Sequence, residues 1–437
     1  MSQPPRRISP PLRLRGAVIV PGDKSISHRA AILNAVAAGP ATVENFLPAD
    51  DCLATLDCLR ALGVSWSLER SGDESARLSL TGQGIGGLRE SADALDARNS
   101  GTTMRLLAGL LAGRPFLSII TGDESLRSRP MGRVILPLRE MGAQVSGHNG
   151  DSLAPLTIRG GPLRGIHHRS PVASAQVKSA LLLAGLQAEG ETTLEEPARS
   201  RDHTERMLRA MGADLREEGN ALRLSPLRQD LTPLNLRVPG DFSAAAFWLV
   251  AGALHPDAEI SLSDVGVNPT RTGLLDALRE MGADITVSSE RVIGGEPVAD
   301  LRVRSSKLKG IVVEGPAVVR LIDEVPALAV AAALARGRTV IRDVGELRVK
   351  ESDRILATAQ ELRKLGARVE DRPDGLIIEG VGALQGAPCD SRGDHRLAMA
   401  LAVAGMVAQG ETALSGAEAV SISYPGFWQH LAELGSG

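Results

Sequence analysis

Aromatic side chains and cysteine are scarce in this sequence. Aromatic residues make up 2% of the 437 residues, so the core must be built from Ala, Leu, Val and Ile. The three cysteines, Cys52, Cys58 and Cys389, are odd in number, and their spacing fits neither a zinc site nor a redox CxxC pair. We therefore expect buried free thiols in a reducing compartment.

Long apolar runs and a surplus of one charge are lacking too. The longest apolar stretches are alanine-rich and shorter than a membrane span, and the first residues, MSQPPRRISPPLRL, have no apolar segment of the signal-peptide type. The formal net charge is −3, whereas proteins that bind nucleic acid usually carry a basic surplus. We expect a cytoplasmic monomer that binds neither nucleic acid nor a membrane.

Motifs for metals and cofactors are absent or imperfect. HExxH, GxSxG and paired CxxC do not occur. Gly82–Gly87 has the glycine spacing of GxGxxG, but the preceding ARLSLTG alternates polar and apolar residues, unlike a doubly buried parallel strand. Gly16–Ser25 resembles a P-loop with one residue too many and an Asp before the Lys. We expect no metal and no cofactor.

The sequence repeats a short phrase in which Leu-Arg is followed by a Gly four residues after the Leu. The copies begin at Leu59, Leu138, Leu208, Leu278 and Leu362, with a weaker copy at Leu431. They recur at intervals of roughly 70 residues or a little more, which indicates internal repeats. Each copy predicts a helix that ends in a left-handed Gly, and the alternating residues after most copies predict a strand.

Alanine-rich apolar segments mark the same period. We predict that these helices end at Gly39, Gly113, Gly190, Gly337 and Gly410, and near Pro256, each followed by a short strand. Because the segments are apolar nearly all round, the helices should be buried. Six units fit two globular domains of three units each, with three buried helices per domain, sheets outside them and a boundary near residues 238–240.

Polar and basic residues precede the buried helices. Ser174 and Asp241 are reasonable N-caps. Capping does not explain cations at Lys24, Arg29, Arg105 and Arg396, because a cation in the first turn opposes the helix dipole. A bound anion would explain them, since helix N-termini bind anions and Lys or Arg completes such sites.

Basic loops recur at one phase of the repeat. Residues 125–133, 198–206 and 346–354 are rich in Arg and Lys, and each alone fits a solvated loop. Their common position, after the short strand, places them at the same end of each domain as the helix starts. Two domains that face each other by these ends would enclose a charged cleft, which predicts small, multiply anionic substrates.

Eight segments together resemble the signature segments of the 3-phosphoshikimate 1-carboxyvinyltransferases, in order from about Leu14 to Trp428. They are PGDKSISHR, NSGTTMRL, SRPMG, SAQVKSALLLAGL, SRDHTE, IDE, LRVKESDR and GDHRLAMA. The resemblance implies a two-domain, inside-out α/β barrel of six βαβαββ repeats, with buried parallel helices and an active site in the interdomain cleft. It implies one domain of residues 1–20 with 240–437 and another of residues 21–239.

The resemblance also implies the substrates and the residues that bind them. Shikimate 3-phosphate would be bound by Lys24, Ser25, Arg29, Ser174, Ala175, Gln176, Ser200 and Lys350, and phosphoenolpyruvate by Lys24, Gly101, Arg129, Gln176, Arg354 and Arg396, with Arg105 nearby. Asp323 resembles the proton acceptor and Glu351 the proton donor. The 5-hydroxyl would add to C2 of phosphoenolpyruvate, and phosphate would then leave. A carboxylate suits the first step because an alcohol is a poor nucleophile.

Three departures and two alternatives accompany this interpretation. Many relatives have a second Ser at the position of Ala175, and some have a Lys that aligns with Ile422, which leaves one phosphoenolpyruvate contact open. Some have Asn in place of Glu346, and we omit that position because a carboxylate repels phosphate. A UDP-N-acetylglucosamine enolpyruvyl transferase would have Lys-Asn rather than Lys24-Ser25. A non-catalytic phosphate-binding regulator would lack Lys24, Asp323 or Glu351.

Overall fold

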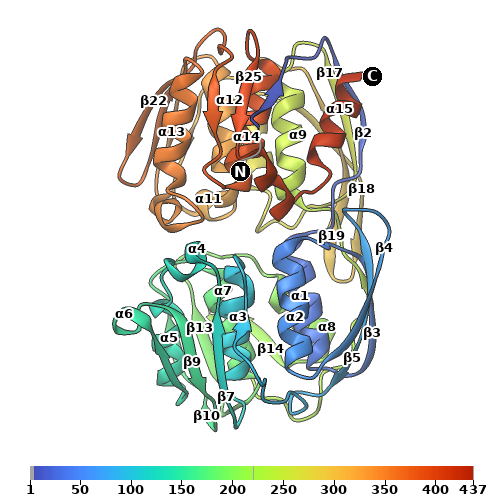
Figure 1. Cartoon of the computed structure of the whole chain (residues 1–437), viewed down its shortest axis with the longest axis vertical. Coiled ribbons are helices and arrows are strands. Elements are labelled where there is room, and N and C mark those ends of the chain that lie inside the picture. Colours follow the sequence, from blue (N-terminus) through green and yellow to red (C-terminus); the bar gives the residue numbers. More distant parts are fainter. Residues whose placement is uncertain (1–3, 220, 437) are drawn as a thin grey trace. The chain divides into compact units, whose positions relative to one another are not determined.

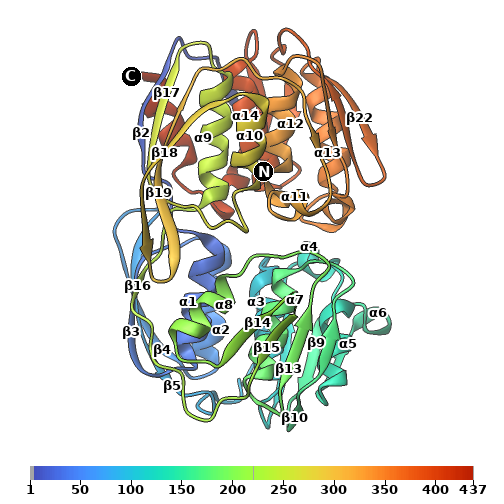
Figure 2. The same cartoon turned by 180° about the vertical axis from the view of Figure 1, so that it is seen from behind.

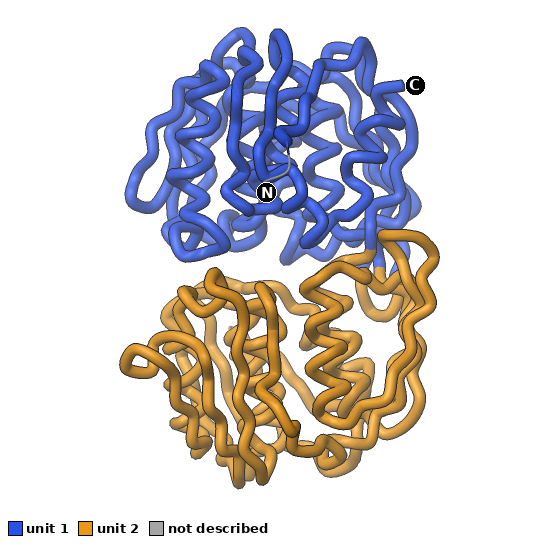
Figure 3. Tube along the Cα trace, viewed as in Figure 1, with its two compact units in different colours: residues 1–21, 239–292, 297–437 blue, residues 22–238, 293–296 orange. Residues whose placement is uncertain are grey.

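The structure is a computed structural model that describes residues 4–219 and 221–436. The chain divides into two compact units (Figure 3). Unit 1 comprises Met1–Pro21, Pro239–Val292 and Pro297–Gly437, and unit 2 comprises Gly22–Val238 and Ile293–Glu296. Unit 1 therefore combines segments far apart in the sequence. Parallel pairing of β2 (Leu14–Val18) with β17 (Ala258–Gly266) joins two of them.

Unit 2 contains the same four-stranded sheet three times. The strand orders are β16-β3-β5-β4, β6-β7-β9-β8 and β11-β13-β15-β14. In each sheet the first pair is parallel and the other two pairs are antiparallel. The strands are β3 (Ala38–Phe46), β4 (Ser65–Arg70), β5 (Ala76–Gln83), β6 (Leu95–Asp96), β7 (Leu117–Thr121), β8 (Gln144–Gly147), β9 (Leu153–Arg159), β11 (His167–Arg169), β13 (Thr192–Glu195), β14 (Leu215–Glu218), β15 (Ala221–Leu224) and β16 (Leu236–Arg237), with a separate pair β10 (Leu163–Arg164) and β12 (Ala188–Glu189).

Unit 1 repeats the pattern with one shorter sheet. Its strand orders are β18-β19-β17-β2, β20-β21-β23-β22 and β1-β25-β24. Figure 2 shows the first of these sheets along one side of the unit, next to α9. The remaining strands are β1 (Arg6–Ile8), β18 (Asp284–Ile293), β19 (Glu296–Arg304), β20 (Val312–Val313), β21 (Arg338–Ile341), β22 (Arg368–Arg372), β23 (Gly375–Glu379), β24 (Pro388–Asp390) and β25 (Thr412–Ser415).

The repeated Leu-Arg phrase ends a helix in five of its copies. The helices are α2 (Asp50–Ala61), α5 (Gly132–Glu140), α8 (His203–Ala210), α10 (Gly273–Met281) and α13 (Arg354–Lys364), and they are followed by Gly63, Gly142, Gly212, Gly282 and Gly366. All five glycines have φ between 86° and 107°, which only Gly adopts without strain. The predicted left-handed cap is confirmed in these copies. It is wrong for the weak copy, because Gly435 lies inside α15 (Phe427–Ser436).

The alanine-rich segments form six buried helices that end earlier than predicted. They are α1 (Lys24–Ala35), α3 (Gly101–Leu111) and α7 (Ala175–Gly185) in unit 2, and α9 (Phe242–Leu254), α12 (Val325–Leu334) and α14 (His395–Val407) in unit 1. The glycines chosen as helix ends lie beyond these bounds. Gly39, for example, belongs to β3, where it pairs with Gly82. At Gly39 the chain has therefore left the helix and paired with the sheet before the predicted helix end.

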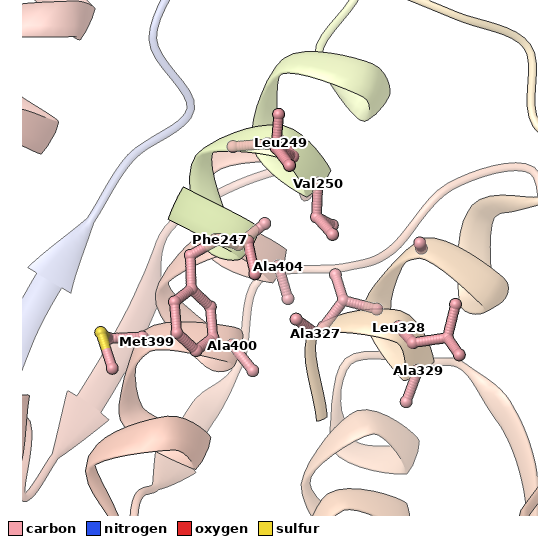
Figure 4. Close-up of a cluster of buried hydrophobic side chains, with 14 of the residues drawn as sticks. Phe247, Leu249, Val250, Ala327, Leu328, Ala329, Met399, Ala400 and Ala404 are labelled. Carbon is pink, nitrogen blue, oxygen red and sulfur yellow. The ribbon is translucent and has the colours of Figure 1, made fainter. Parts of the chain in front are cut away.

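Aliphatic and small side chains fill the core of unit 1. Its helices α9, α12 and α14 contact one another and lie side by side in Figure 1. Phe247, Leu328 and Met399 project among alanines of these helices in Figure 4. Most aromatic residues of this unit gather at one place, where Trp248 stacks on Phe427 with ring centroids 5.0 Å apart. The expected aliphatic core is thus confirmed, with a local aromatic cluster.

A glycine sets the distance between two buried helices of unit 2. A Cβ atom on Gly109 of α3 would lie 2.0 Å from the carbonyl oxygen of Ala180 in α7. The two helix backbones therefore touch at this point, and any larger residue would push them apart. This contact matters for function because α3 and α7 both begin with predicted substrate-binding residues, Gly101 and Ala175.

Two further expectations concern thiols and membrane spans. Cys52, Cys58 and Cys389 are free and buried, as predicted. Burial raises the pKa of the Cys58 thiol to about 12 and that of Cys389 to about 11, so that both stay protonated at neutral pH. Among residues 4–219 and 221–436, no helix has the length and hydropathy that a bilayer span requires.

Substituting the contact glycine should destabilise unit 2. We expect Gly109→Val to lower the free energy of unfolding by about 1–3 kcal/mol, because the extra methyl groups overpack the α3–α7 contact. Urea denaturation followed by circular dichroism measures this. Gly161→Ala is the matched control, since a Cβ at Gly161 meets no atom within 4 Å. Equal stability of the two variants would contradict the close contact.

Candidate functional site

The start of α1 carries the first predicted site residues of unit 2. Asp23 caps this helix, because its carboxylate accepts a hydrogen bond of 2.9 Å from the backbone N–H of Ile26. Lys24 follows, and its Nζ lies 3.0 Å from Oδ2 of Asp51, with 15% of the Lys24 side chain exposed. A carboxylate thus holds the ammonium group at the end of a buried helix, where an anionic substrate group can share it.

Arg29 lies one turn further along α1 and is almost fully buried. Its Nε donates to Oγ1 of Thr204 at 2.7 Å and its Nη2 to Oγ of Ser179 at 2.8 Å. Its Nη1 donates to the backbone oxygen of Ser25 at 3.0 Å. Burial lowers the pKa of Arg29 to about 10, and Glu205 works in the opposite direction. Arg29 therefore stays charged at neutral pH and ties Ser25 to α7 and α8.

The starts of α3 and α7 meet through Arg105 and Gln176. Nη1 of Arg105 donates to Oε1 of Gln176 at 2.5 Å, and Nε2 of Gln176 donates to Oγ1 of Thr102 at 3.0 Å. A Cβ atom at Gly101 would lie 2.6 Å from Nη1 of Arg105. Gly101 therefore leaves space that the guanidinium group of Arg105 uses. The structure brings together Gly101, Arg105 and Gln176, the three predicted residues at these helix starts.

Arg129 comes next to them in the loop after α4 (Glu124–Arg127). Its Nη2 donates to Oδ1 of Asn99 at 2.5 Å and to Oγ of Ser125 at 3.2 Å. The same Cβ atom at Gly101 would lie 3.6 Å from Nη1 of Arg129, so this guanidinium also faces the start of α3. Two arginines therefore face one helix N-terminus, an arrangement that is suited to binding an anion.

Ser174 and Ser200 are brought together by Glu196. The Glu196 carboxylate accepts the backbone N–H of Ser174 at 2.9 Å and the hydroxyl of Ser200 at 2.7 Å. Ser174 is the N-cap residue of α7, as predicted, but its side chain makes no cap hydrogen bond. Glu196 accepts the backbone N–H of this cap residue, as the glutamate of a capping box does. Ala175 is the first residue of α7.

A buried ion triad supports these two serines. Nζ of Lys178 lies 2.9 Å from Oε2 of Glu196 and 2.7 Å from Oε1 of Glu205. Burial disfavours the charged form of Lys178, but the two carboxylates outweigh it and raise the pKa of Lys178. Burial also raises the pKa of Glu205. Sequence reasoning missed this triad, although Lys178 and Glu205 lie in quoted motifs, because nothing in the sequence places them beside Glu196.

In unit 1, Asp323 lies among cations. It belongs to the turn η1 (Ile322–Glu324) just before α12, and 9% of the residue is exposed. Oδ1 of Asp323 lies 3.4 Å from Nη1 of Arg354 and 4.0 Å from Nζ of Lys350. Oδ2 lies 3.7 Å from Nη2 of Arg396. The structure thus brings together four of the five residues predicted in this unit, and cations around it favour an ionised carboxylate.

The fifth predicted residue, Glu351, pairs with the same arginine. Oε2 of Glu351 lies 2.7 Å from Nη2 of Arg354, whose Nε donates to Oδ2 of Asp394 at 2.8 Å. Burial works against the charge of Arg354, but Asp394 and Glu351 outweigh it and raise the pKa of Arg354. Asp394 caps α14 through the backbone N–H groups of Arg396 and Leu397, and Arg354 holds the pKa of Asp394 below its usual range despite burial.

The remaining positions lie at the edges of this cluster. Nζ of Lys350 lies 3.5 Å from Oε1 of Glu346, so the carboxylate that we omitted from the site faces a lysine. Ile422 ends the turn η3 (Ala417–Ile422) and is partly exposed. Lys350 follows the turn η2 (Gly345–Val349). The structure adds Arg271, Glu324 and Asp394, which the motifs did not single out.

The described side chains offer anion binding and proton transfer rather than a metal site. Within residues 4–219 and 221–436, His, Cys, Asp and Glu do not form a group of three or more that is suited to a metal ion. Each unit instead contains several buried or half-buried cations held by carboxylates, and unit 1 adds two carboxylates, Asp323 and Glu351, on one arginine.

The chain is similar to known proteins over nearly its whole length. Residues 8–431 match the family EPSP synthase (3-phosphoshikimate 1-carboxyvinyltransferase). A 3-phosphoshikimate 1-carboxyvinyltransferase of Herpetosiphon aurantiacus is 55% identical, over 97% of each chain. One from Gloeobacter violaceus is 56% identical, over 98% of each chain. A solved structure of EPSP synthase from Acinetobacter baumannii has 45% identity and a TM-score of 0.86, and the match covers 98% of this chain and 97% of that chain.

These similarities agree with the anion-binding side chains and the repeated mixed sheets described above. Relatives that share more than half of their residues with this chain over at least 97% of its length show the family. The chain belongs to the EPSP synthase (3-phosphoshikimate 1-carboxyvinyltransferase) family of transferases.

Proposed function

We propose that this protein transfers the enolpyruvyl group of phosphoenolpyruvate to the 5-hydroxyl of shikimate 3-phosphate, a step of the shikimate pathway toward aromatic amino acids. The observation that carries the proposal is the position of Asp323, a buried carboxylate surrounded by Lys350, Arg354 and Arg396. A base among cations suits a reaction in which the hydroxyl group of one anionic substrate attacks the enol carbon of another.

Unit 2 supplies most of the proposed contacts to shikimate 3-phosphate. We assign its phosphate to Ser174, Ala175 and Ser200, where a helix begins and two serines are held by Glu196. Lys24, Ser25, Arg29 and Gln176 complete the site, and Lys350 of unit 1 reaches the same substrate. Arg29 acts mainly by holding the backbone of Ser25, since its three nitrogens all donate to protein oxygens.

Phosphoenolpyruvate carries a phosphate and a carboxylate, so it needs several cations. We assign Lys24, Gly101, Arg129 and Gln176 of unit 2, with Arg105 in support, and Arg354 and Arg396 of unit 1. Arginine suits this task because its planar fork matches carboxylate and phosphate oxygens. Each charge-assisted hydrogen bond contributes about 1.5–3 kcal/mol. The two sets of residues are proposed to serve one reaction.

Two proton transfers complete the reaction. Asp323 takes the proton of the attacking 5-hydroxyl as the new C–O bond forms at C2 of phosphoenolpyruvate. C3 gains a proton to become a methyl group and loses one again when phosphate leaves. Glu351, which lies beside Arg354, and Lys24 are the proposed groups for C3. Charge on the departing phosphate is stabilised by the arginines named above.

Further features of the family are proposals for this chain. We propose that the repeated sheets and buried helices form an inside-out α/β barrel of six βαβαββ repeats. We also propose that the chain has two domains, residues 1–20 with 240–437 and residues 21–239, and that it works as a monomer in the cytoplasm.

Removing the base should abolish turnover but not binding. We expect Asp323→Asn to lower kcat by about 10²–10⁴-fold, which is the usual contribution of a general base. Shikimate 3-phosphate should still bind, because the substitution removes a negative charge near an anion. Phosphate release measures kcat, and isothermal titration calorimetry measures binding. Turnover close to that of the wild type would refute the base role of Asp323.

The two substrates should respond to different substitutions. We propose that the Ser200 hydroxyl turns from Glu196 to the phosphate when shikimate 3-phosphate binds, so Ser200→Ala should raise KM for this substrate by about ten- to a hundredfold through the loss of that charge-assisted hydrogen bond. Arg129→Lys should raise KM mainly for phosphoenolpyruvate, because lysine cannot form the forked contact. Each variant is the control for the other. If each change raised both KM values equally, the division of the substrates between these residues would be wrong.

A further inference from the structure

Asp323 is followed directly by a second buried carboxylate, Glu324. The two residues share the turn η1, and 9% of Asp323 and 1% of Glu324 are exposed. Two carboxylates that are buried so close together repel each other, so that one of them tends to take up a proton unless cations compensate. A protonated Asp323 cannot accept a proton from the attacking alcohol. The site therefore needs cations that face both carboxylates.

Several charged groups face this pair from the surrounding elements. The cations are Arg271 before α10, Lys350 after η2, Arg354 on α13 and Arg396 on α14, and the further anions near them are Asp241 before α9, Glu346 on η2, Glu351 before α13 and Asp394 before α14. Three of these cations, Lys350, Arg354 and Arg396, are assigned above to the substrates. When the substrates bind, these three must share their charge with incoming anions.

Arg271 differs from them because it faces the carboxylates and has no assigned substrate contact. Its guanidinium is 3% exposed, and Nη1 lies 4.0 Å from Oδ2 of Asp323 and 4.0 Å from Oε1 of Glu324. The sequence Asn-Pro-Thr-Arg directs it inward, because the backbone N–H of Arg271 donates to the oxygen of Asn268 at 2.8 Å in a turn with Pro at its second position.

Hydrogen bonds fix the guanidinium group in this orientation. Nη2 of Arg271 donates to Oγ of Ser243 at 2.6 Å and to Oδ1 of Asp241 at 3.3 Å. The Ser243 hydroxyl donates in turn to Oε1 of Glu324. Since a hydroxyl has one hydrogen, the directions of these bonds are determined. Asp241 is held by its own role as the cap of α9. The chain from Asp241 to Glu324 is thus a rigid support.

We propose that Arg271 is a positioning residue that keeps the Asp323 carboxylate ionised and in place beside Glu324 while the substrates draw on the other three cations. This inference rests on the base role proposed above for Asp323. It assigns Arg271 no contact with either substrate. Ser243 links Arg271 to Glu324, because its hydroxyl accepts a hydrogen bond from the arginine and donates one to the carboxylate.

The test is the pH dependence of kcat for phosphate release with both substrates saturating. The rate falls at acid pH as the base becomes protonated. Removing a cation 4 Å away favours protonation, so Arg271→Gln should move the half-maximal rate to higher pH by about one unit. Arg271→Lys retains the charge, so its half-maximal rate should fall at a pH between those of Arg271→Gln and the wild type. KM for either substrate should change less than kcat.

Glu324→Gln should shift the pH profile in the opposite direction. This second variant tests the proposal even if Arg271→Gln does not fold. Removing a like charge beside Asp323 should move the half-maximal rate to lower pH. Arg338→Gln is the matched control, since Arg338 lies on β21 and pairs with the exposed Glu379 at 3.4 Å. Its pH profile should coincide with that of the wild type.

The outcomes separate this inference from the proposed function. Opposite shifts in Arg271→Gln and Glu324→Gln would support the positioning role. Unshifted profiles in folded variants would overturn it, even with Asp323→Asn inactive, and would leave the base role intact. Full turnover in Asp323→Asn would overturn the base role instead, whatever the two profiles do.

Discussion

The structure depends on one constraint, which is that a charge removed from water must be paired. Lys24 is held by Asp51, Lys178 by Glu196 and Glu205, and Arg354 by Glu351, Asp323 and Asp394. These pairs allow cations to stay charged at the ends of apolar helices. They also fix the side chains before any ligand arrives, which reduces the entropy that binding would otherwise cost. Buried pairs contribute little net stability, so we attribute them to function.

Small residues bring these charges to one place in each unit. In unit 2, α3 and α7 approach closely at Gly109, and the same two helices place Arg105 and Gln176 within hydrogen-bond distance at their first turns. In unit 1, alanines let α9, α12 and α14 pack against one another (Figure 4). The residues before these helices are Asp241, Asp323 and Asp394, which form or hold the cluster around Arg354 and Arg271. Close packing of helices through small residues thus accounts both for the scarcity of aromatic side chains and for the arrangement of the site.

Local patterns in the sequence predicted what local physics determines. The left-handed glycines after five helices follow from the repeated phrase, and the buried helices follow from their alanine content. The candidate site residues came from the resemblance to the family, and their motifs lie at or just before helix starts. Helix ends were misjudged because strand pairing, a contact between distant segments, decides them. Glu196 and Arg271 were missed for a similar reason. Each looks like an ordinary charge in the sequence, and only the folded chain shows Glu196 beside Ser174 or Arg271 beside Asp323. Ser174 occupies the cap position that the sequence predicted, and the Glu196 carboxylate, which lies 22 positions away, accepts its backbone N–H.

The central claim is that these paired charges serve the transfer of an enolpyruvyl group to shikimate 3-phosphate. The most direct measurement is the release of phosphate from phosphoenolpyruvate by the purified protein, with either shikimate 3-phosphate or UDP-N-acetylglucosamine as the acceptor. The account predicts release with shikimate 3-phosphate and none above background with the nucleotide sugar. Release with the nucleotide sugar alone, or with neither acceptor in a folded protein that binds phosphoenolpyruvate, would contradict it.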